Sequence, residues 1–150
     1  MKEIQEELPS NVLSLLKDTL DNHSSIAMTD VNGKIIYVND RACKISKYSK
    51  KELIGKNHNK LQSGFHSKLF YQKLWNTITS GRVWKGDIRN LTKDGKVYWM
   101  RTVISPRFNE KTEIIGFIAI RTPITDLMKS VEKQIKNRDS ETIRKLRDGA

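Results

Sequence analysis

An amide and an indole with the chemistry to hold a polar heterocycle lie six residues apart in the segment 84–106. The side chain of Asn90 offers a hydrogen-bond donor and an acceptor side by side. The indole of Trp84 offers a flat, apolar wall. If both side chains face the interior of a sheet, the buried amide must be hydrogen-bonded, either to other core groups or to a ligand.

The segment 84–106 predicts one long β-hairpin, and the type of turn decides which side chains face inward. A two-residue loop at Asp94 and Gly95 would place Arg101 on the inner face. A type I turn at Lys93 and Asp94, with Gly95 as a left-handed bulge, keeps Arg101 in water, and we prefer it. The inner face then carries Trp84, Gly86, Ile88, Asn90, Tyr98, Met100, Thr102 and Ile104.

Helical and strand patterns alternate along the rest of the chain. In order, they predict a helix over 3–22 that is interrupted at Pro9, a hairpin over 25–38, short helices over 39–62, a helix over 67–79, a last strand over 113–122 and a helix over 124–147. Ser10 or Asn11 is expected to cap the restarted first helix, and Asn137 to Ser140 to interrupt the last. This order indicates an α+β fold, a five-stranded antiparallel sheet with short helices on one face.

Local signals mark several of these boundaries. Ser49, followed three residues later by Glu52, is a capping box, and Gly55 suits the end of the same short helix. Ser67 is expected to cap the helix over 67–79. Pro123 is expected to end the last strand.

Length and charge narrow the classes of function. The 150 residues suffice for one domain with helical extensions. The net charge of +11 is spread over single lysines and arginines. No helix-turn-helix pattern or zinc-ligand spacing accompanies it, so we expect a lysine-rich surface and no nucleic-acid partner. No catalytic motif, glycine-rich phosphate loop or cluster of metal ligands is found, so neither an enzyme nor a metal site is expected.

Cysteine content and hydropathy bear on the compartment. Cys43 is the only cysteine, which excludes an internal disulfide and suits a reducing compartment. No apolar run of 18 or more residues is present, so no membrane span is expected. The N-terminus lacks the apolar stretch of a signal peptide. We therefore expect a cytoplasmic protein.

Three motifs together resemble the PAS domain, a sensory module of bacterial signalling. They are T-D-V-N-G-K-I-I-Y-V-N-D, Y-S-K-K-E-L-I-G-K-N and K-D-G-K-V-Y-W, and the resemblance covers roughly residues 24–125. It implies a sensory domain over 23–124, with an N-terminal amphipathic cap helix over 1–22. It also implies a C-terminal signalling helix over 125–150.

A narrower resemblance concerns a cofactor. The runs L-W-N-T-I-T-S-G-R-V-W-K-G-D-I-R-N and G-F-I-A-I-R-T-P are similar to the FAD-binding PAS sensors of the aerotaxis (energy-taxis) receptor and nitrogen-fixation redox regulator type. The resemblance implies that Trp84 packs beside the flavin ring, that Asn90 bonds its pyrimidine edge and that Asn39 belongs to the same site. His58 and Asn59 match a His-Asn pair of these sensors. FMN, or no cofactor, is the alternative.

The light-sensing LOV branch of the family carries G-x-N-C-R-F-L-Q where this chain has G-K-N-H-N-K-L-Q. His58 replaces the cysteine that forms the photoadduct, and Cys43 lies a whole helix earlier. The resemblance therefore implies redox sensing instead of a cysteine photocycle. Arg121 matches a signalling glutamine of LOV domains. It either senses the charge of the ring or lies in water at the strand end.

The sequence thus predicts a sensor of redox, energy or oxygen status that signals to a chemoreceptor, kinase or cyclase. The alternative is a cofactor-free module for dimerisation or partner docking. The apolar stripe over 10–22 favours a homodimer through the N-terminal helix, and a second stripe begins at Leu127. Haem is not expected, because the resemblance implies an axial histidine on the long helix, and His23, His58 and His66 all lie outside the helix over 67–79.

Overall fold

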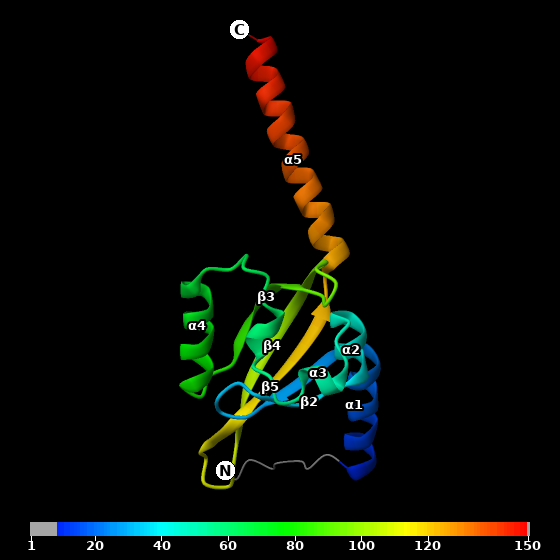
Figure 1. Cartoon of the computed structure of the whole chain (residues 1–150), viewed down its shortest axis with the longest axis vertical. Coiled ribbons are helices and arrows are strands. Elements are labelled where there is room, and N and C mark those ends of the chain that lie inside the picture. Colours follow the sequence, from blue (N-terminus) through cyan, green and yellow to red (C-terminus); the bar gives the residue numbers. More distant parts are fainter. Residues whose placement is uncertain (1–8, 150) are drawn as a thin grey trace, which may run out of the picture.

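The computed structural model describes residues 9–149. Its elements are α1 (Ser10–His23), β1 (Ser25–Thr29), β2 (Ile35–Val38), α2 (Asp40–Ser46), α3 (Lys50–Leu53), the 3-10 helix η1 (His58–Leu61), α4 (Lys68–Thr79), β3 (Trp84–Leu91), β4 (Val97–Phe108), β5 (Ile114–Pro123) and α5 (Thr125–Asp148). The five strands form one antiparallel sheet in the order β2-β1-β5-β4-β3 (Figure 1). The predicted α+β fold is confirmed.

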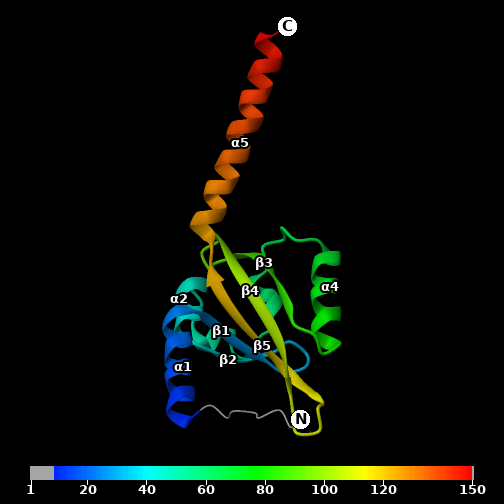
Figure 2. The same cartoon turned by 180° about the vertical axis from the view of Figure 1, so that it is seen from behind.

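The core is divided into two clusters of buried residues. One joins β1 and β2 to the short helices: Ala27, Ile35, Val38, Ala42, Leu53 and Leu61. The other joins α4 to β3, β4 and β5: Leu74, Ile78, Ile88, Ile104, Phe117 and Ala119. Helix α5 leaves the sheet and projects away from this core, as both side views show (Figures 1 and 2). The short helices and α4 therefore cover separate parts of the sheet.

The hairpin of β3 and β4 has the preferred register. Asn90 pairs with Tyr98 and Trp84 with Ile104. The turn is closed by a hydrogen bond from the Gly95 amide to the Thr92 carbonyl, and Gly95 has a φ of +82°. The left-handed glycine thus sets which side chains of the hairpin face inward.

Replacing Gly95 with alanine is expected to lower the free energy of unfolding by about 1 kcal/mol, because a Cβ disfavours the left-handed region. The space around a Cβ at this position is empty, so the effect would be conformational and not steric. Asparagine tolerates this region better and should cost less. Urea unfolding measures all three proteins, and equal stability of the alanine variant would contradict this account of the turn.

Two predicted helix features are wrong. Helix α1 begins at Ser10 after Pro9 without a side-chain cap, so neither Ser10 nor Asn11 is the cap. The part of the predicted helix over 3–8 lies outside the described residues. Helix α5 continues through Asn137 and Ser140 without a break. Polar residues in an exposed helix cost only a few tenths of a kcal/mol each, and this helix has no interior glycine or proline.

The other capping predictions are confirmed. Ser49 and Glu52 form both bonds of a capping box at α3, and Ser67 Oγ accepts the Phe70 amide at 3.1 Å at the start of α4. Gly55 follows α3 with a φ of +80°. Among the residues from 9 to 149, no helix is long and apolar enough to cross a membrane.

Candidate ligand-binding site

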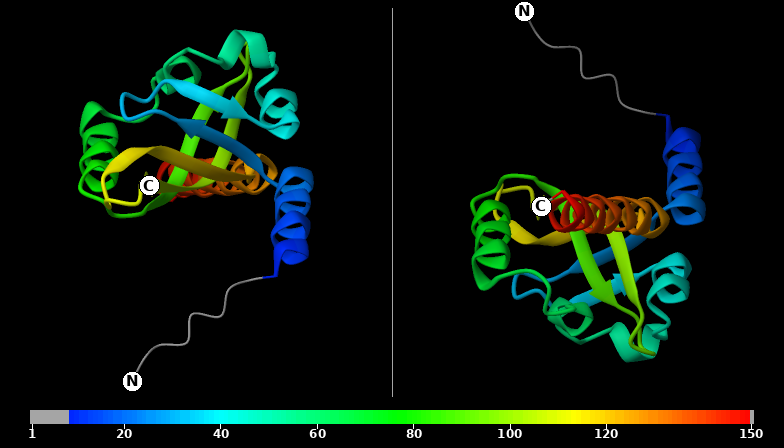
Figure 3. Two further views of the ribbon diagram at one scale, coloured as in Figure 1. Left: turned by 90° about the horizontal axis from the view of Figure 1, so that it is seen from below. Right: turned by 90° about the horizontal axis from the view of Figure 1, so that it is seen from above.

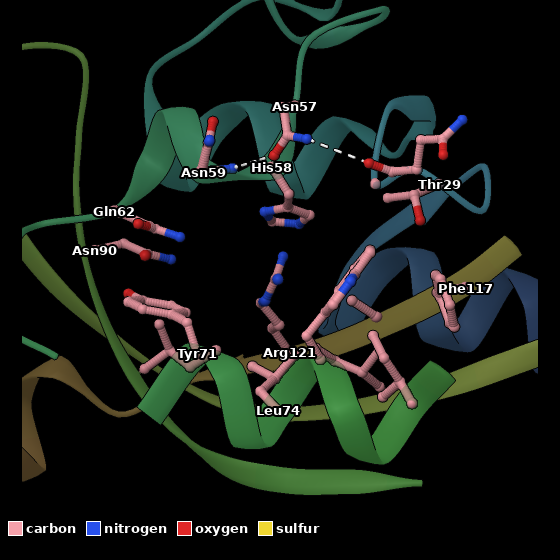
Figure 4. Close-up of a pocket in the computed structure, with 17 residues that line it drawn as sticks. Thr29, Asn57, His58, Asn59, Gln62, Tyr71, Leu74, Asn90, Phe117 and Arg121 are labelled. Atoms are coloured by element: carbon pink, nitrogen blue, oxygen red, sulfur yellow. Dashed lines mark hydrogen bonds between the residues drawn. The ribbon is translucent and has the colours of Figure 1, made fainter. Parts of the chain in front are cut away.

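A cavity of about 290 Å³ lies between the sheet, η1 and α4 (Figure 4). The segment around η1 contributes Asn57, His58, Asn59 and Gln62; α4 contributes Tyr71, Leu74, Trp75 and Ile78; and the sheet contributes Asn90, Phe117 and Arg121, among others. The exposed Asn57, Asn59 and Trp75 mark its solvent side. The cavity is therefore lined by the second core cluster and opens toward η1.

Arg121 is the cation of this cavity. It lies on the central strand β5, between Ser25 on β1 and Thr102 on β4, and is only 6% exposed. Its buried Nε has no hydrogen-bond partner, and no carboxylate lies within ion-pair distance among the described residues. Burial lowers the pKa of Arg121 to about 10, against the opposing effect of Tyr98 and Tyr71. A buried, uncompensated charge of this kind is costly without a partner.

His58 faces the same cavity from η1. The helix is held in place by Asn57, whose Oδ1 accepts the Asn59 amide at 3.0 Å. The Nε2 atom of His58 is buried and has no partner. Burial, and then the charge of Arg121, lower the pKa of His58 to about 3, so the imidazole is neutral at physiological pH.

A third unpartnered atom is the hydroxyl of Tyr71 on α4. Its pKa is raised, chiefly by burial. Asn90, 4% exposed, also borders the cavity, and its backbone forms a bridge with Gln62. Figure 4 shows His58, Tyr71, Asn90 and Arg121 converging on one region. Buried polar atoms without partners are rare, so three of them at one cavity make it the candidate ligand-binding site.

Acid is expected to destabilise the ligand-free protein through His58. Its pKa is depressed in the folded state, so the unfolded chain binds more protons between pH 6.5 and about pH 3. The contribution is complete above pH 6.5 and falls by about 1.4 kcal/mol per unit as the pH drops below it. Urea unfolding from pH 7 to pH 5 measures this slope.

The matched variant is His58→Gln, which keeps a polar side chain and removes the titration. It should flatten the slope without abolishing it, because His66 also has a lowered pKa from burial and from Arg89. A slope in His58→Gln equal to that of the parent would contradict a buried, neutral His58.

Asn39 does not line the cavity. Its Oδ1 accepts the Ile26 and Ala42 amides, both at 3.0 Å, and its Nδ2 donates to the Ser24 carbonyl at 2.8 Å. It is the N-cap of α2 and ties that helix to β1. The structure therefore does not bring Asn39 to the cavity, because its amide is already satisfied by backbone groups.

The indole at the cavity belongs to Trp75 and not to Trp84. Trp84 lies over Gly86, where an added Cβ would come within 2.5 Å of its ring, and it packs edge-on against Phe70. Trp75 lines the cavity and lies 5.5 Å from Phe117 between ring centroids. The structure thus places Trp84 outside this cavity, half-buried against the second core cluster beside Phe70 and Gly86.

Sequence reasoning also missed Tyr71 and Gln62. A signal existed for Tyr71, because Tyr71, Leu74, Trp75 and Ile78 follow the spacing i, i+3, i+4, i+7 that places side chains on one helix face. The polar tip of a tyrosine on an apolar stripe is a reason to expect a cavity there.

His66 is engaged outside the cavity. Its Nε2 accepts the Arg89 amide at 2.9 Å, and its ring stacks on Phe70. Ser63 Oγ donates to the Arg89 carbonyl at 2.7 Å. The segment after η1 is thus fastened to the edge strand β3 beside Asn90.

The fold and the cavity together define a small α+β module with a cavity between its sheet, its short helices and α4. The model of the PAS domain family matches residues 23–126, and the chain belongs to this family.

Several known proteins are similar. The aerotaxis receptor of Escherichia coli is 32% identical over 106 residues, which are 71% of this chain and 21% of the receptor. The nitrogen fixation regulatory protein of Klebsiella oxytoca is 28% identical over 113 residues, 75% of this chain and 23% of that protein. The chain thus spans about a fifth of these relatives.

Among solved structures, the PAS domain of a protein from Colwellia psychrerythraea is 28% identical with a TM-score of 0.63, over 77% of this chain and 98% of that one. The light state of the blue-light photoreceptor Aureochrome1 LOV matches at 19% identity with a TM-score of 0.66, over 82% and 98%. The second match bears on the fold alone.

Proposed function

We propose that this PAS domain binds a flavin, with FAD as the first candidate and FMN as the second, and that it senses redox, energy or oxygen status without turnover. The observation that carries the proposal is the group of three buried polar atoms without partners, on Arg121, His58 and Tyr71, that line one cavity. The resemblance to flavin-binding PAS sensors supports the choice of ligand.

The lining residues fit the polar edge of a flavin. That edge presents carbonyl oxygens beside an N–H, so it accepts from a guanidinium or phenol and pairs with a side-chain amide. Arg121 and Tyr71 supply the donors, and Asn90 supplies the amide. Trp75 and Phe117 supply apolar surface for the ring. The cavity volume of about 290 Å³ suits a ring system, so the phosphates of FAD or FMN would lie toward solvent.

A bound flavin would supply a reversible change of charge on reduction. Arg121, as a fixed cation, would then gain or lose an electrostatic partner, and Asn90 and His58 would exchange hydrogen bonds with the ring. These responses arise on β3, η1 and β5, which surround the cavity.

The output is proposed to run through α5. Arg121 lies two residues before Pro123, the end of β5. Beyond it, the Ile124 amide donates to the Trp99 carbonyl at 2.9 Å, and the Trp99 amide donates to Thr125 Oγ1 at 3.0 Å. A shift of β5 against β4 would therefore reorient α5, which would report to a chemoreceptor, kinase or cyclase type of partner.

The test is the absorbance spectrum of the purified protein, followed by acid release and chromatography of any chromophore. We expect a yellow protein and expect Asn90→Leu to bind flavin at least tenfold more weakly, as a lost buried pairing implies. Trp84→Phe, outside the cavity, is the matched control and should retain binding. A parent protein that stays colourless after addition of FAD and of FMN would sink the proposal.

A second candidate is a dimerisation module without a cofactor. Exposed apolar side chains on α1 favour it: Leu13, Leu15, Leu16 and Leu20 are 55%, 65%, 45% and 37% exposed. Light scattering should then report a homodimer that Leu16→Glu dissociates. A monomeric parent protein at micromolar concentration would count against this reading.

A further inference from the structure

The segment over α2, α3 and η1 is one of the most basic parts of the chain. Residues 40–60 carry seven basic and two acidic side chains, an excess of five within the net charge of +11. Helix α5 also has seven basic residues, but five acidic ones reduce its excess to two. The exposed lysines of the first segment, called the basic face below, are Lys44, Lys47, Lys50, Lys51, Lys56 and Lys60.

Contacts join two of these lysines to the β3–β4 turn, and a third, Lys50, pairs with Asp40 at 2.9 Å. Lys60 Nζ donates to the Glu52 carbonyl at 3.3 Å, and the Glu52 carboxylate pairs with Lys93 of the turn at 2.8 Å. Lys47 pairs with Asp94 of the same turn at 3.6 Å. In the right view of Figure 3, the teal helices and the far ends of β3 and β4 meet at the lower edge. The β3–β4 turn is therefore part of the basic face, and the face reaches the root of α5, which is hydrogen-bonded to Trp99 near the start of β4.

The basic face carries lysine in place of arginine, and this choice of cation bears on the class of partner that it can bind. Protein interfaces are enriched in arginine and depleted in lysine. Nucleic-acid sites use arginine for planar, two-pronged contacts. The one arginine between residues 40 and 60, Arg41, is half-buried and donates to the Asn22 carbonyl. The ammonium group of lysine is a hydrated point charge on a flexible side chain. Such groups suit a surface whose negative charge is spread evenly, as it is across anionic lipid headgroups.

An apolar side chain lies within the basic face. Ile54, at the end of α3 between Lys51 and Lys56, is 41% exposed. A single aliphatic side chain surrounded by cations suits the boundary between headgroups and acyl chains. We infer that the basic face docks on the surface of an anionic lipid bilayer. This inference goes beyond the sensor function, because it places the domain at a membrane surface and holds whether or not a cofactor is bound.

The experiment is co-sedimentation of the full chain with vesicles of phosphatidylcholine alone, or with phosphatidylglycerol as about a third of the lipid, at about 0.1 M salt. Binding is expected only to the anionic vesicles. The triple variant Lys44→Gln, Lys51→Gln, Lys56→Gln is expected to lower the partition coefficient at least tenfold, because each lysine near such a surface contributes roughly fivefold. Ile54→Ser should weaken the residual binding at high salt.

The matched control removes the same charge from α5, as Lys129→Gln, Lys133→Gln, Lys136→Gln, and is expected to change binding less than about threefold. Thermal unfolding checks that both triple variants are folded. Equal losses in the two variants would mean that net charge alone drives binding, and would overturn the inference. Absence of binding to anionic vesicles would overturn it too, as would tighter binding to an RNA oligonucleotide or to polyglutamate at the same salt.

Discussion

Replacing Asn39 with alanine is expected to lower the free energy of unfolding by about 3 kcal/mol. The cost has two parts. Loss of the N-cap of α2 accounts for about 1 kcal/mol. The rest comes from the Ile26 amide and the Ser24 carbonyl, which lose their bonds to Asn39 in a region where Asn39 is only 3% exposed. Urea unfolding measures the change.

Ser67→Ala is the matched control, because Ser67 caps α4 in an exposed position and makes no bond to another strand. It should cost about 1 kcal/mol. Comparing Ser67→Ala with Asn39→Ala separates the cost of losing a helix cap alone from the cost of losing a cap that also ties α2 to β1. Should Asn39→Ala lose flavin while its ligand-free form keeps the stability of the parent, Asn39 would be a ligand contact and the structural assignment would fall.

The second large effect is expected at Arg121, and its sign differs between stability and binding. The fall in the pKa of Arg121 from 12.5 to about 10 corresponds to about 3 kcal/mol against the charged side chain. The guanidinium stays protonated at any working pH, so the ligand-free fold carries that cost. Arg121→Met should therefore stabilise the ligand-free protein by about 1–3 kcal/mol.

The same substitution should weaken flavin binding at least tenfold, since the cavity loses its cation. Unfolding of the ligand-free protein and fluorescence titration with flavin measure the two effects separately. Arg101→Met is the control: this exposed arginine pairs with Asp87 at 3.2 Å and should change stability by less than about 0.5 kcal/mol. A destabilised ligand-free Arg121→Met protein would show that the guanidinium is already satisfied.

The register of the β3–β4 hairpin could be predicted because its cause is local. Gly95 permits the left-handed bulge, and the alternation of the strands then places Asn90 inward. The continuity of α5 could not be predicted in the same way. Asn137 and Ser140 favour helix ends by tenths of a kcal/mol, and their neighbours outweigh that preference.

The candidate site could be predicted only in part, because local sequence patterns fix which side chains face inward but not which of them a helix covers. Asn90, His58 and Asn59 border the cavity, in line with the resemblance. Arg121 borders it too, and does not lie in water at the strand end, which was the other possibility. The inner face of the hairpin, however, is shared between core and cavity. Trp84 and Asn90 both face inward, but Phe70 of α4 covers only the first. Where α4 packs is a tertiary property that alternation along a strand does not encode.

Helix α5 has a mechanical consequence for any signal that reaches it. Its 24 residues form a single straight lever about 36 Å long, held at its root by the backbone of Trp99. A tilt of about 5° at that root moves the far end by about 3 Å, more than the change in hydrogen bonding that could cause it. The unbroken helix would thus convert a sub-ångström rearrangement beside Arg121 into a displacement large enough to alter the side-chain packing of α5 against a partner.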